Sequence, residues 1–332
     1  MIRILIIRTG AVGDCIFTTP ILTCLRRSYE NISIDVLGNR DYLSPLVASG
    51  LADASHSIDH PGVSRIFIPQ GEIPSDLGAF FESYDVVLSF FPDPQGTFYQ
   101  NLFSLGIPMI LRGAPKPDSG KRIHITRCLM LALDPLKIDT SLVIPSITIP
   151  PSGLSEVSKS YLSDIEQMSA PLIAIHPGSG GRNKCWPVAS FAELVVGITK
   201  RGWNVVFTSG PADDEVIESL HQHLRHMMPR VLKHLPLSEL GCILGQCAGF
   251  IGNDTGITHL AAAMGIPTIA LFGPTDPAVW GPRGRSVRIL WGNYVIEGDV
   301  AEVDVSPISA DCLLENISVG CILGALGEIT RT

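Results

Sequence analysis

Short apolar segments alternate with amphipathic segments along the first half of the chain. Apolar runs of this length predict buried strands, and the amphipathic segments have the spacing of helices that bury one face. The strands are expected near 2–7, 32–38, 84–90 and 107–111, and the helices near 15–28, 41–49, 75–82 and 121–133. Because such alternation indicates a parallel sheet covered on both faces, residues 1–150 are predicted to form a doubly wound α/β domain.

The same alternation restarts after a turn-rich segment. Residues 145–153 are rich in Pro, Ser and Gly, as a linker would be, and a connecting helix follows up to Met168. The later strands are expected near 172–176, 204–208, 249–252 and 268–272, and the helices near 188–201, 213–227, 238–247 and 256–264. Residues 151–308 are therefore predicted to form a second doubly wound domain.

The final segment, residues 309–332, is expected to hold one more helix. Its apolar pattern runs from Ser309 to Leu326 and is interrupted at Gly320. We expect this segment to pack back against the first domain.

Composition and charge narrow the class of protein. The chain has 332 residues, of which 45% are hydrophobic and 17% charged, so it is long enough for two domains with full cores. The formal net charge of −8 argues against a nucleic-acid partner, because such domains carry a basic excess. Basic residues nevertheless crowd one stretch of the first half, where an anionic partner could bind: Arg112, Lys116, Lys121, Arg122 and Arg127. A solvated basic face is the alternative.

The cysteines and the apolar runs bear on the compartment. Eight cysteines are scattered without C-x-x-C pairs or zinc-site spacing, which is typical of reduced, structural thiols in a cytoplasmic protein. No run approaches the roughly 18 apolar residues of a membrane span, and Arg8 interrupts the first run, so we expect a buried strand there and not a leader. The protein is expected to be cytoplasmic, at most peripheral to a membrane.

Open α/β sheets bind ligands beyond the carboxyl ends of their strands, so we expect two such domains to face each other across a cleft lined by strand-to-helix loops. The first of these loops, Arg8–Asp14, lets a ligand or backbone approach closely at Gly10 and Gly13. Asp14 can accept a proton from a substrate hydroxyl, or it can simply cap the helix, a role worth about 1 kcal/mol. Taken alone, its position favours the cap.

The second loop, Pro177–Pro187, follows the strand at 172–176. Ser179, Gly180 and the neighbouring glycines offer a hydroxyl and exposed N–H groups, and Lys184 supplies a mobile positive charge for a diphosphate. A solvated loop lysine is the structural alternative. Glycine-rich surroundings after a buried strand favour ligand contact.

The third loop opens a helix at Asp254-Thr255-Gly256, and either Asp254 or Thr255 can cap it. Backbone N–H groups near Gly256, at the positive end of the helix dipole, are suited to a phosphate. His259 lies about one helical turn later, on a similar face. Taken alone it is interpreted as a structural histidine, but a phosphate bound at the turn would favour a role in binding.

Together the three loops resemble the heptosyltransferase family of inverting glycosyltransferases, which transfer heptose from ADP-heptose to the inner core of lipopolysaccharide. The resemblance covers nearly the whole chain. Its motifs are Gly13-Asp14, His176-Pro177-Gly178, Lys184-x-Trp186-Pro187, Asn253-Asp254-Thr255-Gly256-x-x-His259 and Phe272-Gly-Pro-Thr-Asp-Pro277. It implies two Rossmann-like domains in the GT-B arrangement, with the donor held by the second and the acceptor by the first.

The resemblance also implies residue roles. Asp14 matches the family's proposed general base, Lys184 its diphosphate-binding lysine, and the segment from Asp254 to His259 its donor-binding turn. For the acceptor we expect Gly13 and the basic residues Arg112, Lys121 and Arg122. No cofactor or metal is expected, because Lys184 and the helix N-terminus supply the positive charge and the chain has no D-x-D motif.

Two features depart from the family pattern. Relatives often carry Asp-Leu-Gln-Gly and then an arginine where this chain has Pro92-Asp-Pro-Gln-Gly96 followed by Thr97, so acceptor contacts there can differ. The ribose-contacting carboxylate is open among Asp213, Asp214 and Glu215. A nucleotide-sugar epimerase, a donor-binding protein without turnover, and a transferase of another sugar to a surface glycan are the alternative functions.

Overall fold

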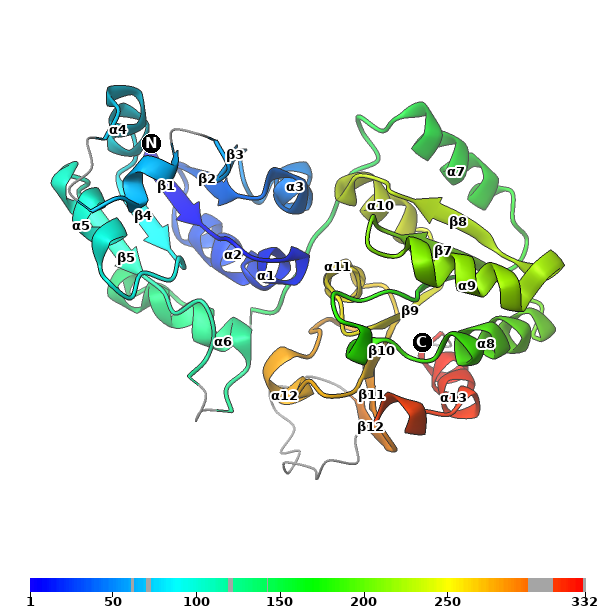
Figure 1. Ribbon diagram of the computed structural model, residues 1–332. Coiled ribbons are helices and arrows are strands. Elements are labelled where there is room, and N and C mark those ends of the chain that lie inside the picture. Colours follow the sequence, from blue (N-terminus) through cyan, green and yellow to red (C-terminus); the bar gives the residue numbers. More distant parts are fainter. Residues whose placement is uncertain (61–62, 70–72, 119–121, 142, 298–312, 331–332) are drawn as a thin grey trace. The chain divides into compact units, whose positions relative to one another are not determined.

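The computed structural model describes residues 1–60, 63–69, 73–118, 122–141, 143–297 and 313–330. Contacts between Cα atoms divide the chain into two compact units, Met1–Ile147 and Thr148–Thr332. Each unit is a sheet flanked by helices (Figure 1).

The sheet of the first unit is entirely parallel and has the strand order β3-β2-β1-β4-β5. Its strands are β1 (Ile2–Ile7), β2 (Ile32–Gly38), β3 (Ala54–Ser57), β4 (Val86–Ser89) and β5 (Met109–Arg112). Its helices are α1 (Val12–Phe17), α2 (Thr19–Ser28), α3 (Arg40–Ala48), α4 (Ser75–Glu82), α5 (Thr97–Ser104) and α6 (Ile125–Met130), with 3-10 turns at Val63–Phe67 and Leu131–Leu136. Leu5 and Ile7 of β1 pack in one buried cluster with Phe81 of α4 and Phe98 of α5.

Among the described residues, the second unit has seven strands in the order β12-β11-β10-β9-β6-β7-β8, of which only β12 runs antiparallel to its neighbour. Its strands are β6 (Leu172–His176), β7 (Asn204–Ser209), β8 (Arg230–Lys233), β9 (Gly249–Asn253), β10 (Thr268–Phe272), β11 (Val287–Trp291) and β12 (Tyr294–Glu297). Its helices are α7 (Glu156–Glu166), α8 (Val188–Lys200), α9 (Asp214–Leu224), α10 (Leu237–Leu244), α11 (Gly256–Ala263), α12 (Pro277–Trp280) and α13 (Val319–Ile329), with 3-10 turns at Arg182–Lys184, Arg225–Met227 and Leu314–Asn316.

The two sheets repeat one strand order. The strands β8-β7-β6-β9-β10 of the second sheet follow one another in the same order as β3-β2-β1-β4-β5 of the first, so that β6 corresponds to β1 and β9 to β4. In both, the order reverses beside the first strand, between β1 and β4 and between β6 and β9. The predicted fold class, two doubly wound parallel sheets, is confirmed, and each unit has a topological switch point at which α/β proteins bind ligands.

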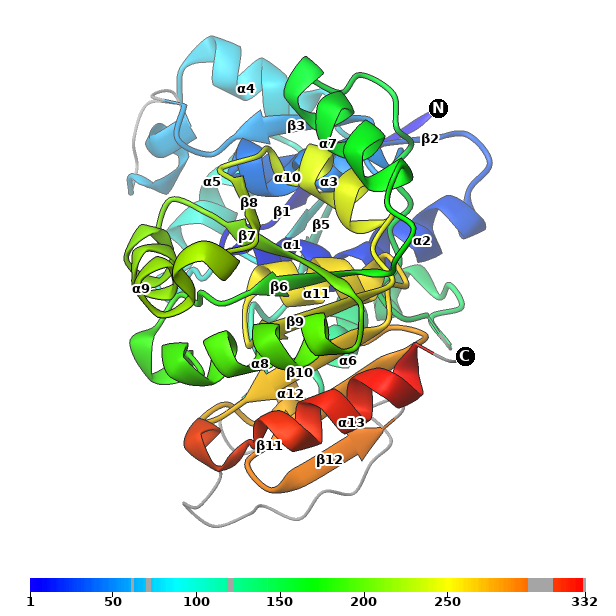
Figure 2. The same ribbon diagram turned by 90° about the vertical axis from the view of Figure 1, so that its right-hand side faces the viewer.

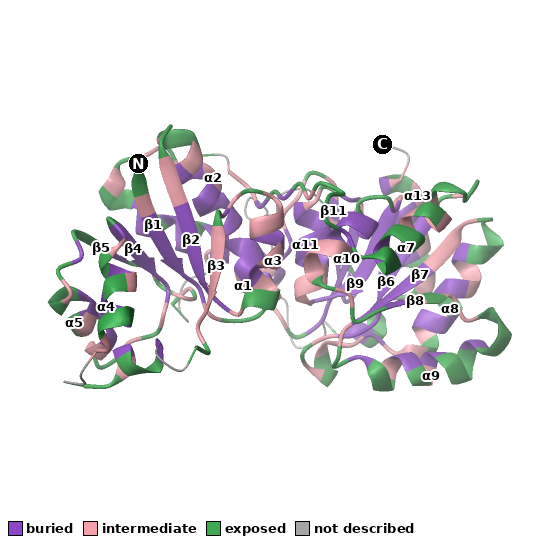
Figure 3. Ribbon diagram, turned by 90° about the horizontal axis from the view of Figure 1, so that it is seen from above, coloured by how far each residue is buried: buried purple, intermediate pink, exposed green. Residues whose placement is uncertain are grey.

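Burial follows the expected pattern. The central strands are buried along most of their length, and helices such as α9 bury one face and expose the other (Figure 3). Phe191, Leu194 and Val195 form the buried side of α8, in the same cluster as Ile175 of β6. This packing fixes α8, and with it the loop that connects β6 to α8.

The C-terminal helix differs from its sequence-based prediction. Residues 309–312 lie outside the described residues, and α13 begins only at Val319, where Ser318 Oγ accepts a hydrogen bond from Cys321 N, so Gly320 lies inside the helix and does not interrupt it. Ile322 and Leu326 are buried in the second-unit core beside α8 (Figure 2). Packing of this segment against the first domain stays a prediction.

Several short elements were not predicted. Strands β3, β8 and β12 are edge strands, where polar side chains such as Ser55, His56 and Lys233 dilute the apolar pattern. Helix α5 and strand β11, which lies inside the second sheet, were also not predicted. The segment predicted as one helix over 121–133 is instead α6 followed by a 3-10 turn that carries Pro135. Pro135 has no N–H to donate to the carbonyl four residues earlier, so an α-helix does not continue through it.

Candidate functional site

Two of the predicted loops start side by side at the switch point of the second unit. Strand β6 pairs in parallel with β9, with His176 opposite Gly252. The loop after β6 carries Ser179, Gly180 and Lys184, and the turn after β9 carries Asp254. Pairing of the two strands therefore brings these candidate donor-binding residues together at the carboxyl ends of the strands.

Asn253 joins the two loops. Its side-chain amide donates to the carbonyl oxygens of Pro177 and Gly178, at 2.8 and 3.2 Å, and its Oδ1 accepts a hydrogen bond from Trp186 N at 3.0 Å. Asn253 is fully buried, so these bonds are made away from water. From the sequence, Asn253 was recognised only as part of a motif; a buried amide at the end of a strand was the available signal for this role.

Asp254 is the residue on which the candidate donor-binding side chains converge. Lys184 Nζ lies 2.7 Å from Asp254 Oδ2, and Ser179 Oγ donates to the Asp254 carbonyl at 2.8 Å. His259 Nε2 lies 3.8 Å from Oδ1. Asp254 and His259 are buried, whereas 36% of the Lys184 side chain is exposed. Lys184 is therefore a cation held at the surface by a buried carboxylate.

These contacts change the acidity of Asp254. Burial by itself raises the pKa of the carboxyl, but the hydrogen bonds and charges of His259 and Lys184 outweigh it and lower the pKa to about 2. Asp254 thus stays ionised at any physiological pH and keeps Lys184 in place.

The turn at Thr255 leaves the first turn of α11 without a side-chain cap. Thr255 occupies the cap position with extended backbone and makes no side-chain cap hydrogen bond, while the Asp254 carboxylate is directed to Lys184 and His259. The expectation that one of these two side chains caps α11 is therefore wrong. The N–H groups of Gly256 and Ile257 lie in the first turn, where a helix has no acceptor of its own. They form, with the helix dipole, a site suited to an anion.

Gly180 leaves open space beside this turn. It is exposed, and a Cβ built on it would meet no heavy atom within 4 Å. Gly178, in contrast, faces the buried carboxylate of Asp213, 1.8 Å from where its Cβ would be. Only glycine fits at Gly178, because the loop closes over that carboxylate.

The three carboxylates considered for the ribose have different surroundings. Asp213 is buried, accepts a hydrogen bond from Gly210 N at 2.7 Å and lies 3.7 Å from His176 Nε2. Asp214 pairs with Lys233 and His234, and Glu215 pairs with Arg182 on the surface. Asp213 is thus used to hold the loops, which leaves Asp214 and Glu215 as the carboxylates on exposed side chains.

In the first unit, Asp14 lies in the first turn of α1, beyond the switch-point strand β1. Its Oδ1 accepts from Arg8 Nη2 at 2.7 Å, and its Oδ2 accepts from Ala11 N at 2.9 Å. Gly10 has a φ of 125°, and a Cβ there would lie 2.4 Å from Asp14 Oδ2. Gly13, buried within α1, precedes it. Asp14 thus has the contacts of a cap, while 29% of its side chain is exposed for a ligand.

Arg8 was not predicted from the sequence to take part in the site. This side chain is 1% exposed, and burial, the largest influence, lowers the pKa of its guanidinium while the charge of Asp14 opposes the change. One signal in the sequence could have indicated this role. Arg8 directly follows a buried strand and precedes the candidate base by six residues, so its side chain could reach the carboxylate.

The basic residues expected at the acceptor lie on several elements. Arg112 ends β5 and stacks over the ring of Tyr99, with 4.0 Å between its Cζ and the ring centroid. Lys116, Arg122 and Arg127 are exposed, and Lys121 lies outside the described residues.

Neither a metal-ligating cluster nor a membrane-spanning helix occurs in the described part of the chain. No group of three or more His, Cys, Asp or Glu side chains there is arranged to hold a metal ion. No helix there is both long and apolar enough to cross a membrane.

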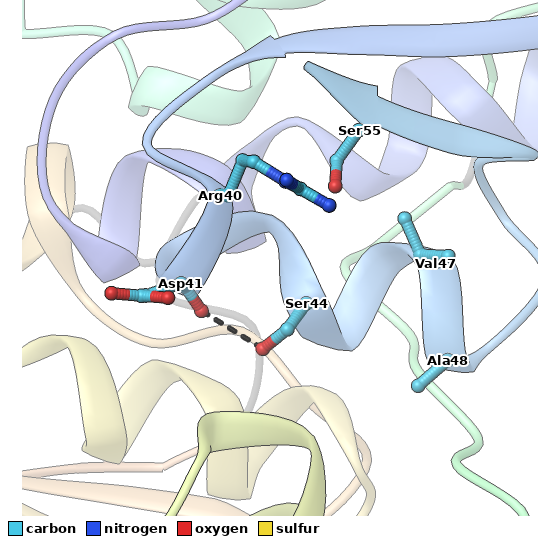
Figure 4. Close-up of a pocket in the computed structure, with 6 residues that line it drawn as sticks. All are labelled: Arg40, Asp41, Ser44, Val47, Ala48 and Ser55. Carbon is cyan, nitrogen blue, oxygen red and sulfur yellow. Dashed lines mark hydrogen bonds between the residues drawn. The ribbon is translucent and has the colours of Figure 1, made fainter. Parts of the chain in front are cut away.

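A shallow hollow of about 460 Å³ lies between α3 and β3 of the first unit (Figure 4). Its lining residues are Arg40, Asp41, Ser44, Val47, Ala48 and Ser55. In it, Ser44 Oγ donates to the Asp41 carbonyl at 2.8 Å. None of the candidate site residues lines this hollow, so it is separate from the candidate site.

Comparison with known proteins points to one family. Residues 106–305 match the model of glycosyltransferase family 9 (heptosyltransferase). Lipopolysaccharide heptosyltransferase 3 of Escherichia coli is 23% identical over 85% of this chain and 87% of its own length.

Solved structures share the fold. ADP-heptose lipopolysaccharide heptosyltransferase II of E. coli has a TM-score of 0.75 at 21% identity, covering 99% of both chains. The E. coli heptosyltransferase WaaC, solved with ADP, has a TM-score of 0.68 at 16% identity, covering 99% of this chain and all of that one.

The low pKa of Asp254 predicts a contribution to stability that depends on pH. Its folded-state pKa of about 2 lies below the roughly 3.9 of an exposed aspartate, so the contribution is present above pH 4 and is lost as pH falls toward 2. The free energy of unfolding of the wild type should exceed that of Asp254→Asn at pH 5, and the difference should narrow by about 2 kcal/mol at pH 2. Chemical denaturation across this range measures it, and a difference that stays constant with pH would contradict the assignment.

Proposed function

This chain belongs to glycosyltransferase family 9, the heptosyltransferases, and we propose that it transfers heptose from ADP-heptose to a sugar of the lipopolysaccharide inner core by a single inverting displacement. The observation that supports the proposal is the convergence of Lys184, Ser179 and the N-terminus of α11 on Asp254 at the switch point of the second unit. A cation, a hydroxyl and free helix N–H groups at one point are what a diphosphate requires.

In the proposed donor site, the diphosphate of ADP-heptose lies at the first turn of α11. The N–H groups of Gly256 and Ile257 donate to phosphate oxygens, and Lys184 turns from Asp254 toward the phosphate. Gly180 allows close approach of the nucleotide. Thr255 and His259 belong to the same donor-binding turn. Asp214 or Glu215 contacts the ribose.

In the proposed reaction, Asp14 accepts the proton of the acceptor hydroxyl as its oxygen attacks the anomeric carbon of heptose. The bond between that carbon and the β-phosphate oxygen breaks, and ADP leaves with the electron pair. Lys184 and the α11 N-terminus stabilise the charge that develops on the leaving group. Attack from the face opposite the leaving group inverts the anomeric centre. The scheme needs no metal ion, because the protein supplies the positive charge.

The acceptor is proposed to bind the first unit. Arg112, Lys121 and Arg122 supply positive charge for an anionic glycolipid, and Gly13 allows it to approach Asp14. Because such an acceptor is anchored in lipid, we propose that the protein works in the cytoplasm in peripheral contact with the inner membrane face.

Nucleotide binding tests the donor site directly. ADP at 100 times its dissociation constant should stabilise the protein by about 2.7 kcal/mol, and UDP and GDP by less. Lys184→Met should remove most of the ADP effect, because a charge-assisted hydrogen bond contributes about 2 kcal/mol. Thermal-shift titration measures both.

Lys200→Met is the matched control for that measurement, because Lys200 is exposed at the end of α8. It should leave ADP stabilisation unchanged. Stronger stabilisation by UDP or GDP than by ADP would indicate a donor with another nucleotide. If the two lysine variants had equal effects, Lys184 would not be part of the donor site.

Replacement of Asp14 tests the chemical step. Asp14→Asn should lower kcat by about 100-fold to 1000-fold, because the proton acceptor is lost, and should leave ADP stabilisation intact. Asp76→Asn, in the first turn of α4, is the control, because it removes an exposed first-turn carboxylate of the same unit. Equal losses of turnover and donor binding would assign Asp14 to capping, and product formed from donor alone would indicate an epimerase.

Charge reversal tests the acceptor site. Arg112→Glu and Arg122→Glu should each raise the acceptor KM about tenfold, which corresponds to about 1.4 kcal/mol, and should reduce co-sedimentation with anionic lipid vesicles. Arg65→Glu reverses an exposed charge elsewhere in the first unit and should change neither. Unchanged acceptor KM and vesicle binding in all three variants would remove the basic residues from the acceptor site.

A further inference from the structure

The buried guanidinium of Arg8 needs a physical explanation. Arg8 directly follows β1 and is 2% exposed, the most buried arginine in the described part of the chain. Arginine is almost never buried to this extent unless it is paired, because removing its charge from water is costly. Something in the first unit must compensate for that cost.

All three guanidinium nitrogens have acceptors. Nη2 donates to Asp14 Oδ1 at 2.7 Å, Nε donates to the Asp14 carbonyl at 3.3 Å, and Nη1 donates to the Pro115 carbonyl at 3.2 Å. The ring of Phe90 lies beneath, 5.5 Å from Cζ. The guanidinium is therefore fixed in position and in plane, and Asp14 carries the charge that balances it.

The same contacts fix Asp14. Arg8 holds Oδ1 and Ala11 N holds Oδ2, so the carboxylate is bound at both oxygens and cannot rotate without losing a hydrogen bond. Each oxygen keeps a further lone pair, and 29% of the side chain is exposed. A carboxylate that is held yet accessible is the arrangement expected of a preorganised base.

Arg8 also reaches a second loop. Pro115 lies between Arg112 and Lys116, in the segment that follows β5 and carries the basic residues assigned to the acceptor. One buried side chain thus connects the candidate base to the candidate acceptor loop within a single unit.

We propose that Arg8 is a positioning residue, which fixes the Asp14 carboxylate and ties it to the loop at Pro115. The proposal rests on the proposed transferase function for its kinetic consequence. Its structural consequence, that the first turn of α1 depends on Arg8, holds whatever the reaction is.

Arg8→Met tests the proposal, because methionine fills similar apolar space but forms none of the three hydrogen bonds. It should lower kcat about 100-fold, the loss expected when a reacting group is misplaced by about 1 Å. Donor binding, measured by ADP stabilisation, should not change, because the donor residues are in the other unit. Arg8→Lys keeps the charge but not the planar fork, and should restore part of the lost kcat.

Arg26→Met is the matched control. Arg26 likewise donates to one carboxylate oxygen, Asp53 Oδ2, and to one backbone carbonyl, that of Leu51, both at 2.9 Å, but it lies away from α1. It should leave kcat within about twofold of wild type. Equal kcat losses in Arg8→Met and Arg26→Met would overturn a specific role for Arg8.

Amide hydrogen exchange separates this proposal from the function. The N–H of Ala11 is held by Asp14 Oδ2, so its exchange reports whether the carboxylate stays in place. Exchange at Ala11 should be at least about tenfold faster in Arg8→Met than in wild type and unchanged in Arg26→Met. Unchanged exchange in Arg8→Met overturns the proposal even in an active enzyme; faster exchange in a protein without transferase activity would support it and contradict only the function.

Discussion

The buried carboxylate of Asp254 holds together the parts of the proposed donor site. Its two oxygens lie against Lys184 and His259, and its carbonyl accepts from Ser179. An ionised group with little exposure is costly unless it is paired, so burial of the Asp254 carboxylate depends on its contacts with Lys184 and His259. The loop after β6 and the turn after β9 are thereby held as one structure.

Binding of a diphosphate would redistribute these charges. Without ligand, Lys184 is neutralised by Asp254, and a diphosphate competes with that carboxylate for the ammonium group. Lysine suits this exchange, because its charge is at the end of a flexible stem and has three donors. The helix N–H groups are fixed by the backbone and need no such rearrangement. In the proposed function, a mobile cation and a fixed dipole together would hold the leaving group and then release it.

The sheet order explains why the candidate residues lie where they do. Asp14 follows β1, and Lys184 and Asp254 follow β6 and β9, at the two places where the strand order reverses. Asn253 in one unit and Arg8 in the other perform comparable tasks, since each is a buried polar side chain at a strand end that fixes the loop with the reactive groups. The same topology thus places a candidate site in each unit, with different side chains.

Much of this could be predicted from the sequence, because periodicity and glycine-rich strand ends are local signals. Most of the central strands, most of the helices that cover them and the three loops were predicted on that basis, and the fold class is confirmed. Strand β11 and helix α5 were not predicted. The edge strands were missed because their polar side chains hide the pattern, and the end of the chain was misjudged because Ser318, not the apolar pattern, sets the start of α13. Arg8 and Asn253 were missed as contributors because the sequence does not show that these side chains are buried, nor that they also bond to Pro115 and Trp186, which are remote in sequence.

A crystal structure of the protein with ADP tests the central claim most directly. We expect the β-phosphate oxygens within about 3.2 Å of the N–H groups of Gly256 and Ile257 and of Lys184 Nζ, with Lys184 turned away from Asp254. ADP bound elsewhere, or bound with the Lys184–Asp254 pair intact and no phosphate at the first turn of α11, would contradict the account.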